Sequence, residues 1–154
     1  MKCILVPIEF SDVTRPVVDL ARQLAKAFGA EIHLVHVKQF TAATAPGTLG
    51  YGLAGMSELA PMSEAMPEDE GEKSKLAKWQ EAIAQDGIKV SLHEPTETVA
   101  KEILSQADEL NADLIVMGTH GHSAMYNLLV GSATKGVLKH STRPVLLVPA
   151  PKSS

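Results

Sequence analysis

Short apolar runs alternate with amphipathic helical patterns along most of this 154-residue chain. The first run, residues 2–8 (KCILVPI), is almost continuously apolar, which is typical of a central parallel strand covered on both faces. Residues 14–28 follow with helical spacing, with Thr14 as the expected N-cap, Phe28 on the inner face and Gly29 as the expected stop. A second apolar run spans 32–37, and such a strand–helix–strand unit makes its two strands parallel through a right-handed crossover.

The same alternation continues to the end of the chain. The further expected elements are helices at 68–84, 96–110 and 132–140 and strands at 88–92, 114–117 and 145–148. Polar and apolar residues alternate in 88–92, which favours a half-exposed strand at a sheet edge. Five strands alternating with four helices predict a doubly wound α/β fold with a parallel sheet.

One domain accounts for residues 1–150, since the length is typical of a single core, and 151–154 form a tail. Residues 38–67 are rich in Ala, Gly, Pro and Met without a sustained period, which predicts a long, mobile, irregular insertion. The net charge is −4 and the 14 basic residues are scattered, so the sequence favours neither nucleic acid nor a membrane surface as partner. The first apolar run is too short for a signal peptide and Cys3 has no disulfide partner, so we expect a cytoplasmic protein.

The glycine-rich segment that follows Met117 is the strongest candidate for a ligand site. Gly118, Gly121 and Gly131 lie in the loop after a buried strand, and Ser132 and Thr134 open the last helix. Loops at the carboxyl ends of parallel strands bind ligands, and glycines and a helix N-terminus together suit a phosphate. The GxGxxG pattern is absent, and in GSATKG the lysine precedes the glycine, so this is not a P-loop.

The spacing Gly118-x2-Gly121-x9-Gly131-Ser132 resembles the ATP-binding signature of the universal stress protein family, and the ILVPIEFS opening and RPVLLVPA ending are similar to it as well. The resemblance implies a Rossmann-like five-stranded parallel sheet of order 3-2-1-4-5, of the adenine nucleotide alpha hydrolase-like type. It also implies a stress-response protein that binds ATP, with Mg²⁺ as the candidate accompanying ion, and hydrolyses it slowly at most. The implied ATP-binding residues are Pro7, Ile8, Glu9, Val37, Met117, Gly118, His120, Gly121, Gly131, Ser132, Ala133 and Thr134. Glu9, which stands where the family usually has Asp, is the candidate metal ligand.

Two other function classes stay open at this point. Residues 119–122 (THGH) also match the [HT]xGH motif of nucleotidyltransferases, although that motif belongs after the first strand and here follows the fourth. A dimeric interaction module that binds no nucleotide is the other alternative. No nucleophile and base pair is evident, so we expect no catalytic residue. His33 and His36 are three apart on one strand and point to opposite faces, which excludes them as a chelating pair.

The last strand, Val145–Val148, is wholly apolar and lies at a sheet edge in the implied order. Helices on both faces would explain this by themselves. An edge also leaves backbone N–H and C=O groups unpaired, however, and antiparallel pairing with a second copy would satisfy them through a two-fold axis. Universal stress proteins commonly dimerise in this way, so we expect a homodimer built on this strand.

Overall fold

The computed structural model describes residues 1–36, 70–95, 98–119 and 130–150. Its elements confirm the predicted alternation of strands and helices. They are β1 (Cys3–Ile8), α1 (Thr14–Phe28), β2 (Glu31–His36), α2 (Glu70–Gln85), β3 (Val90–His93), α3 (Val99–Glu109), β4 (Leu114–Gly118), α4 (Ser132–His140) and β5 (Val145–Val148). The helix expected from residue 96 begins at Val99 instead, and the predicted insertion at 38–67 lies outside the described residues.

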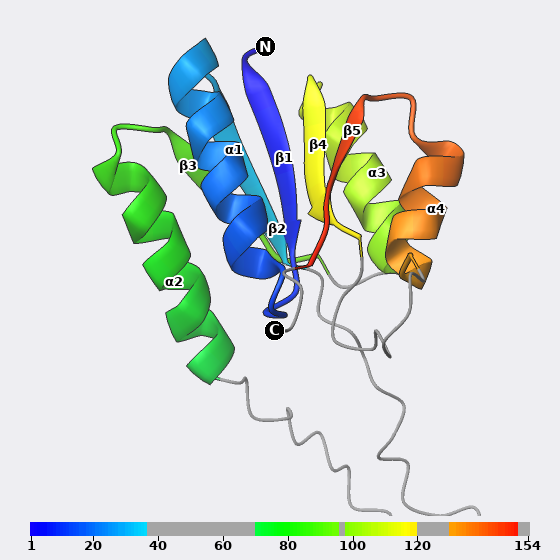
Figure 1. Cartoon of the computed structure of the whole chain (residues 1–154), viewed down its shortest axis with the longest axis horizontal. Helices are drawn as coiled ribbons and strands as arrows, with labels where there is room; N and C mark the ends of the chain where they lie inside the picture. Colours follow the sequence, from blue (N-terminus) through cyan, green and yellow to red (C-terminus); the bar gives the residue numbers. More distant parts are fainter. Residues whose placement is uncertain (37–69, 96–97, 120–129, 151–154) are drawn as a thin grey trace, which may run out of the picture.

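The five strands form one parallel sheet in the order β3-β2-β1-β4-β5, as the resemblance implied (Figure 1). β1 lies in the centre and pairs with β2 on one side and β4 on the other. The chain therefore winds outward in opposite directions from the boundary between β1 and β4. Ligands of open α/β sheets bind outside the carboxyl ends of the strands at such a switch point.

Two hydrophobic cores lie on the two faces of the sheet. Ile4, Val6 and Ile8 pack with α1 and α2, while Cys3 and Leu5 pack with α3 and α4. Because successive side chains of a strand alternate between faces, a strand covered on both sides must be apolar throughout. This explains the continuous apolar run at the start of the chain. Within the described ranges, no helix has the length and apolar character needed to cross a membrane.

The ends of α1 differ in part from the prediction. Gly29 ends the helix in the left-handed conformation, with φ of 64°, as expected. The N-cap, however, is Val13, and Thr14 is the first helical residue. The Thr14 hydroxyl accepts a hydrogen bond from the Ser11 N–H at 3.0 Å and so fixes the turn before the helix. Phe28 was expected on the inner face, but it is 57% exposed. The last buried residue of α1 is Ala25, so the final residues of the helix do not reach the core.

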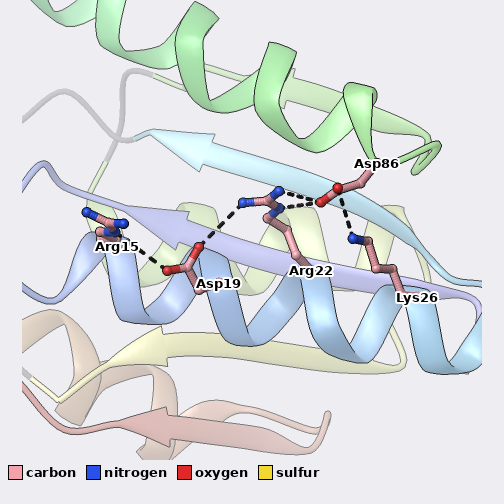
Figure 2. A network of polar contacts seen from close by, with 5 residues as sticks. All are labelled: Arg15, Asp19, Arg22, Lys26 and Asp86. Atoms are coloured by element: carbon pink, nitrogen blue, oxygen red, sulfur yellow. Dashed lines mark hydrogen bonds and ion pairs between the residues drawn. The ribbon is translucent and has the colours of Figure 1, made fainter.

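An ion-pair network ties α1 to the turn after α2 (Figure 2). Arg22 reaches one carboxylate oxygen of Asp86 with Nε at 2.6 Å and Nη2 at 2.5 Å. Lys26 contacts the other oxygen at 2.9 Å. These two cations lower the pKa of Asp86, chiefly through their hydrogen bonds to its carboxylate. The network therefore links two helices on the same face of the sheet.

Candidate functional site

The carboxyl end of β1 contributes the first predicted part of the site. Pro7 is half-buried within the strand, and Glu9 follows the strand and is also half-buried. The side chain of Ile8 is only 4% exposed and belongs to the core under α1. Only the backbone of Ile8 can therefore face a ligand, whereas the position of Glu9 leaves its carboxylate near the surface.

Gly118 ends β4, beside the N-terminus of α1. A Cβ atom at this position would lie 2.4 Å from Cγ1 of Val13, much closer than carbon atoms can approach. The residue thus has a structural reason to be glycine, because the start of α1 packs directly on the end of β4. Met117 precedes it and is 4% exposed in the core under α3 and α4, so its side chain also faces away from solvent.

The N-terminus of α4 lies next to the end of β4. Gly131 is the N-cap, and its N–H donates to the Thr119 carbonyl at 2.9 Å. The buried Thr134 hydroxyl donates to the Gly118 carbonyl at 3.1 Å. Gly131 has no side chain with which to cap the helix, and Ser132 in the first turn is exposed. The two hydrogen bonds hold the start of α4 against the end of β4.

The structure thus brings most of the predicted residues together at the carboxyl ends of β1 and β4. Ala133 is half-buried beside Ser132 in the first turn of α4. Thr134 serves inside the fold, where it joins α4 to β4, rather than at the surface. Val37, His120 and Gly121 lie outside the described residues, as does most of the THGH segment on which the nucleotidyltransferase alternative depends.

Comparison with known proteins gives a match over nearly the whole chain. The family model for the universal stress protein family matches residues 1–149. The chain belongs to this family. A relative in Methanocaldococcus jannaschii, the universal stress protein MJ0531, is 33% identical over 151 residues, which cover 98% of this chain and 84% of the relative.

Solved structures of the family share the fold. The structure of the protein MJ0577 of Methanocaldococcus jannaschii has a TM-score of 0.75 at 23% identity, with 99% of this chain and 98% of the other covered. A universal stress protein of Archaeoglobus fulgidus, solved in complex with dAMP, has a TM-score of 0.63 at 21% identity, with 96% and 97% covered. These similarities confirm the Rossmann-like architecture of order 3-2-1-4-5.

Two residues at the site of this universal stress protein were not among those predicted. Phe10 follows Glu9 and has a φ of 52°, a left-handed conformation that is rare for a bulky residue. Its ring packs against His36, with ring centroids 4.8 Å apart, and Lys75 Nζ lies 5.5 Å from the ring centre. Ser11 comes next, and its hydroxyl oxygen is buried without a hydrogen-bond partner in the described part of the chain. No sequence motif signals either feature, because both arise from the turn between β1 and α1.

Several groups with shifted pKa values lie together away from this site, at the start of β1 and on β2 and β3. Hydrogen bonds from Lys89 and His33 lower the pKa of Glu31. Burial, followed by the neighbouring charge of His33, lowers the pKa of His93. Burial raises the pKa of the Cys3 thiol. These residues form a second polar cluster of this family member, apart from the predicted nucleotide site.

Proposed function

We propose that this universal stress protein binds ATP at the carboxyl ends of β1 and β4. The triphosphate would lie at the N-terminus of α4, near Gly118, Gly121, Gly131 and Ser132, and the nucleoside near Val37 and Pro7 to Glu9. The start of α4, whose N-cap residue is a glycine and which is held at the switch point of the sheet, is the observation that best supports this proposal. Free N–H groups and the positive end of a helix dipole favour a phosphate at such a position.

Two further observations support an adenine nucleotide as the ligand. The Archaeoglobus fulgidus structure contains dAMP, and its fold matches this chain over 96% of the length. In this chain, the buried Ser11 oxygen between β1 and α1 offers a polar group that a ligand could satisfy. Mg²⁺ would accompany the triphosphate, with Glu9 as its candidate protein ligand.

The proposed role is that of a nucleotide-dependent regulatory binding protein of the stress response, with slow ATP hydrolysis at most. Phosphoryl transfer requires a positioned water and groups that stabilise the charge of the transition state. ATP would supply the phosphoanhydride bond, and the residues described here would hold its phosphates and orient the nucleoside. The proposed location is the cytoplasm, in keeping with the free thiol of Cys3.

Replacing Gly131 tests the site. Its φ of −60° and ψ of 158° are open to any residue, so Gly131→Val should fold normally. The added side chain should nevertheless occupy the space of the phosphates and remove ATP binding in calorimetric titration. Leu138→Val, at an exposed position of the same helix, is the matched control and should bind ATP as the wild type does. Unchanged ATP affinity in folded Gly131→Val protein would refute the assignment.

The proposed homodimer involves the free edge of β5. Val145 and Leu147 pack on one core and Leu146 and Val148 on the other, so burial on both faces accounts for the apolar run. The open edge remains as the reason for pairing. The carbonyls of Pro144 and Val148 accept hydrogen bonds from the N–H of Ile115 in β4 and from that of Thr119, just after β4. In a parallel strand, the backbone N–H and C=O groups of successive residues point alternately to the two sides of the strand. The N–H and C=O groups of Val145 and Leu147 therefore point away from β4.

A proline at position 147 tests this proposal. Leu147→Pro removes one outward N–H, and edge strands tolerate proline. Leu147→Ala is the matched control, because it loses the same side-chain packing but keeps the N–H. We expect Leu147→Pro to sediment as a monomer and Leu147→Ala as a dimer. A wild-type protein that is monomeric at micromolar concentration would exclude this dimer.

A further inference from the structure

Three side chains of different chemistry converge at the beginning of β1 and β2. Cys3, Glu31 and His33 each present one possible ligand atom, and these three atoms lie within 4.8 Å of one another. Cys3 is 6% exposed and His33 is 7% exposed, while the Glu31 side chain is 31% exposed. The cluster is therefore buried on the sulfur and imidazole side and open to solvent on the carboxylate side.

The register of the sheet explains why these residues meet. Cys3 of β1 lies directly opposite Glu31 of β2, and paired residues of adjacent strands point to the same face. His33 is two residues further along β2 and so shares that face. The third strand adds His93, which lies opposite Val35 and on the same face again. The four side chains come from three neighbouring strands.

The hydrogen bonds of His33 distinguish its two ring nitrogens. Nδ1 lies 3.0 Å from Nε2 of His93, and Nε2 lies 3.1 Å from Oε1 of Glu31. Without a metal, a proton on Nε2 donates to Glu31. When a metal ion takes the place of that proton, Nδ1–H donates to His93 and the Nε2 lone pair is directed toward the ion. Histidines that bind metals commonly donate their other ring N–H in this way, which fixes the tautomer and the ring orientation.

We propose that Cys3, Glu31 and His33 form a binding site for a zinc ion, with His93 as the group that orients His33. Thiolate sulfur, imidazole nitrogen and carboxylate oxygen are the three ligand types that Zn²⁺ takes in proteins. Tetrahedral coordination needs ligand atoms about 3.3–3.6 Å apart, which follows from Zn–ligand bonds of about 2.0–2.3 Å. The His33 and Glu31 atoms, at 3.1 Å, are already near this spacing, so modest rotation of the side chains completes the site. Three protein ligands leave the fourth position for water or a small ligand.

The charges around the cluster are compatible with a divalent cation. The Cys3 thiol loses its proton when it binds zinc, so the thiolate and the Glu31 carboxylate balance the two positive charges. Lys89 contacts the other carboxylate oxygen of Glu31, Oε2, at 2.7 Å, which leaves Oε1 to the metal. Asp113 accepts the backbone N–H groups of Lys2 and Cys3, at 2.6 and 3.0 Å, and adds negative charge nearby. The exposed side of Glu31 gives the ion a path from solvent.

The test uses the full-length, tag-free protein, freed of metal and titrated with Co²⁺ and then with Zn²⁺. Bound Co²⁺ should show the charge-transfer absorption of a cobalt–thiolate bond, which only Cys3 can supply, since it is the single cysteine of the chain. Zn²⁺ should then abolish that absorption by displacing Co²⁺. A wild-type protein without this absorption would overturn the proposal, whether or not any variant folds.

Variants separate this site from other histidines. Cys3→Ser and His33→Gln should each weaken zinc binding by more than about 100-fold, since loss of a direct ligand exceeds the 10- to 100-fold effect of an orienting group. His93→Leu should weaken it by about 10- to 100-fold. His140→Gln, in the last turn of α4 and exposed, is the matched control and should change nothing.

The two histidines of the THGH segment provide the opposing outcome. If zinc affinity is unchanged in Cys3→Ser but lost when His120 and His122 are both replaced with Gln, the ion binds to those histidines and the proposal is wrong. If neither replacement matters, the cluster is only a hydrogen-bonded group of Lys89, Glu31 and the two histidines, and the proposal is equally wrong.

Discussion

Gly118→Ala should destabilise the fold because of Val13 rather than because of a ligand. The added Cβ would lie 2.4 Å from Cγ1 and 3.1 Å from Cγ2 of Val13, where carbon atoms normally stay about 3.5–4.0 Å apart. Val13 cannot turn away easily, because it is 3% exposed and its branched side chain is stiff at χ1. Overpacking of this kind costs about 1–3 kcal/mol.

The free energy of unfolding should therefore fall by about 2 kcal/mol, which lowers the midpoint of thermal unfolding by about 4–8 °C in a domain of this size. Val13→Ala alone should also cost about 2 kcal/mol, since it removes two buried methyl groups at about 0.8 kcal/mol each and leaves a cavity. In the double variant the alanine at 118 fills that space. The second substitution should then cost almost nothing, which gives a coupling energy of about 2 kcal/mol.

Denaturant unfolding of the wild type, the two single variants and the double variant measures this coupling energy. ATP titration of the same four proteins shows whether Gly118 is needed for packing against Val13 or for binding the ligand. We expect the double variant to bind ATP as Val13→Ala does. Additive losses of stability would refute the steric explanation. A double variant as stable as Val13→Ala but unable to bind ATP would show that glycine at 118 serves the ligand instead.

Three other substitutions test the packing around this framework. Thr134→Val should lower the free energy of unfolding by about 1–3 kcal/mol, because it leaves the Gly118 carbonyl without its donor, whereas Thr134→Ser should be milder in the same denaturant assay. Gly136→Ala places a Cβ 2.7 Å from that of Ala100, so overpacking of about 1–3 kcal/mol should outweigh a gain in helix propensity of about 1 kcal/mol. Adding Ala100→Gly should relieve the overpacking, at its own cost of about 1 kcal/mol in helix propensity. Asp86 has a lowered pKa, so its contribution is present above its ordinary value of 3.8 and is lost as pH falls through the lower value of the folded state. Asp86→Asn should accordingly be less stable than wild type at pH 7, and the difference should vanish in unfolding experiments at strongly acidic pH.

The fold could be predicted because its signals are local. A continuous apolar run at the start of the chain and an alternating run before α3 distinguish a central strand from an edge strand, and the sheet confirms both. Helix ends were less predictable, because they depend on neighbours. Thr14 has the residue type of an N-cap, yet its hydroxyl bonds to the Ser11 N–H and the helix begins one residue earlier.

The candidate nucleotide site was predictable only in part, for a related reason. Glycine spacing identified the ends of β4 and α4, but a sequence cannot show whether a glycine serves a ligand or a close contact. Gly118 meets Val13, more than one hundred residues earlier in the chain, and that contact exists only once β1 and β4 are paired. The conformation of Phe10 is likewise imposed by the turn that joins β1 to α1.

The proposed zinc site depends on pairing between strands, and the length of β1 sets its distance from the candidate nucleotide site. The excluded pair, His33 and His36, does lie apart, since His33 contacts His93 while His36 packs on Phe10. His33 instead joins Cys3 and Glu31 because β1 and β2 are aligned in that register. From Cys3 to Glu9 the strand spans about 20 Å at about 3.3 Å per residue. Zinc-site variants that remain folded should therefore keep the wild-type affinity for ATP, because charges on surfaces this far apart are screened at physiological ionic strength. Loss of ATP binding in folded Cys3→Ser protein would mean that β1 transmits a change between its two ends.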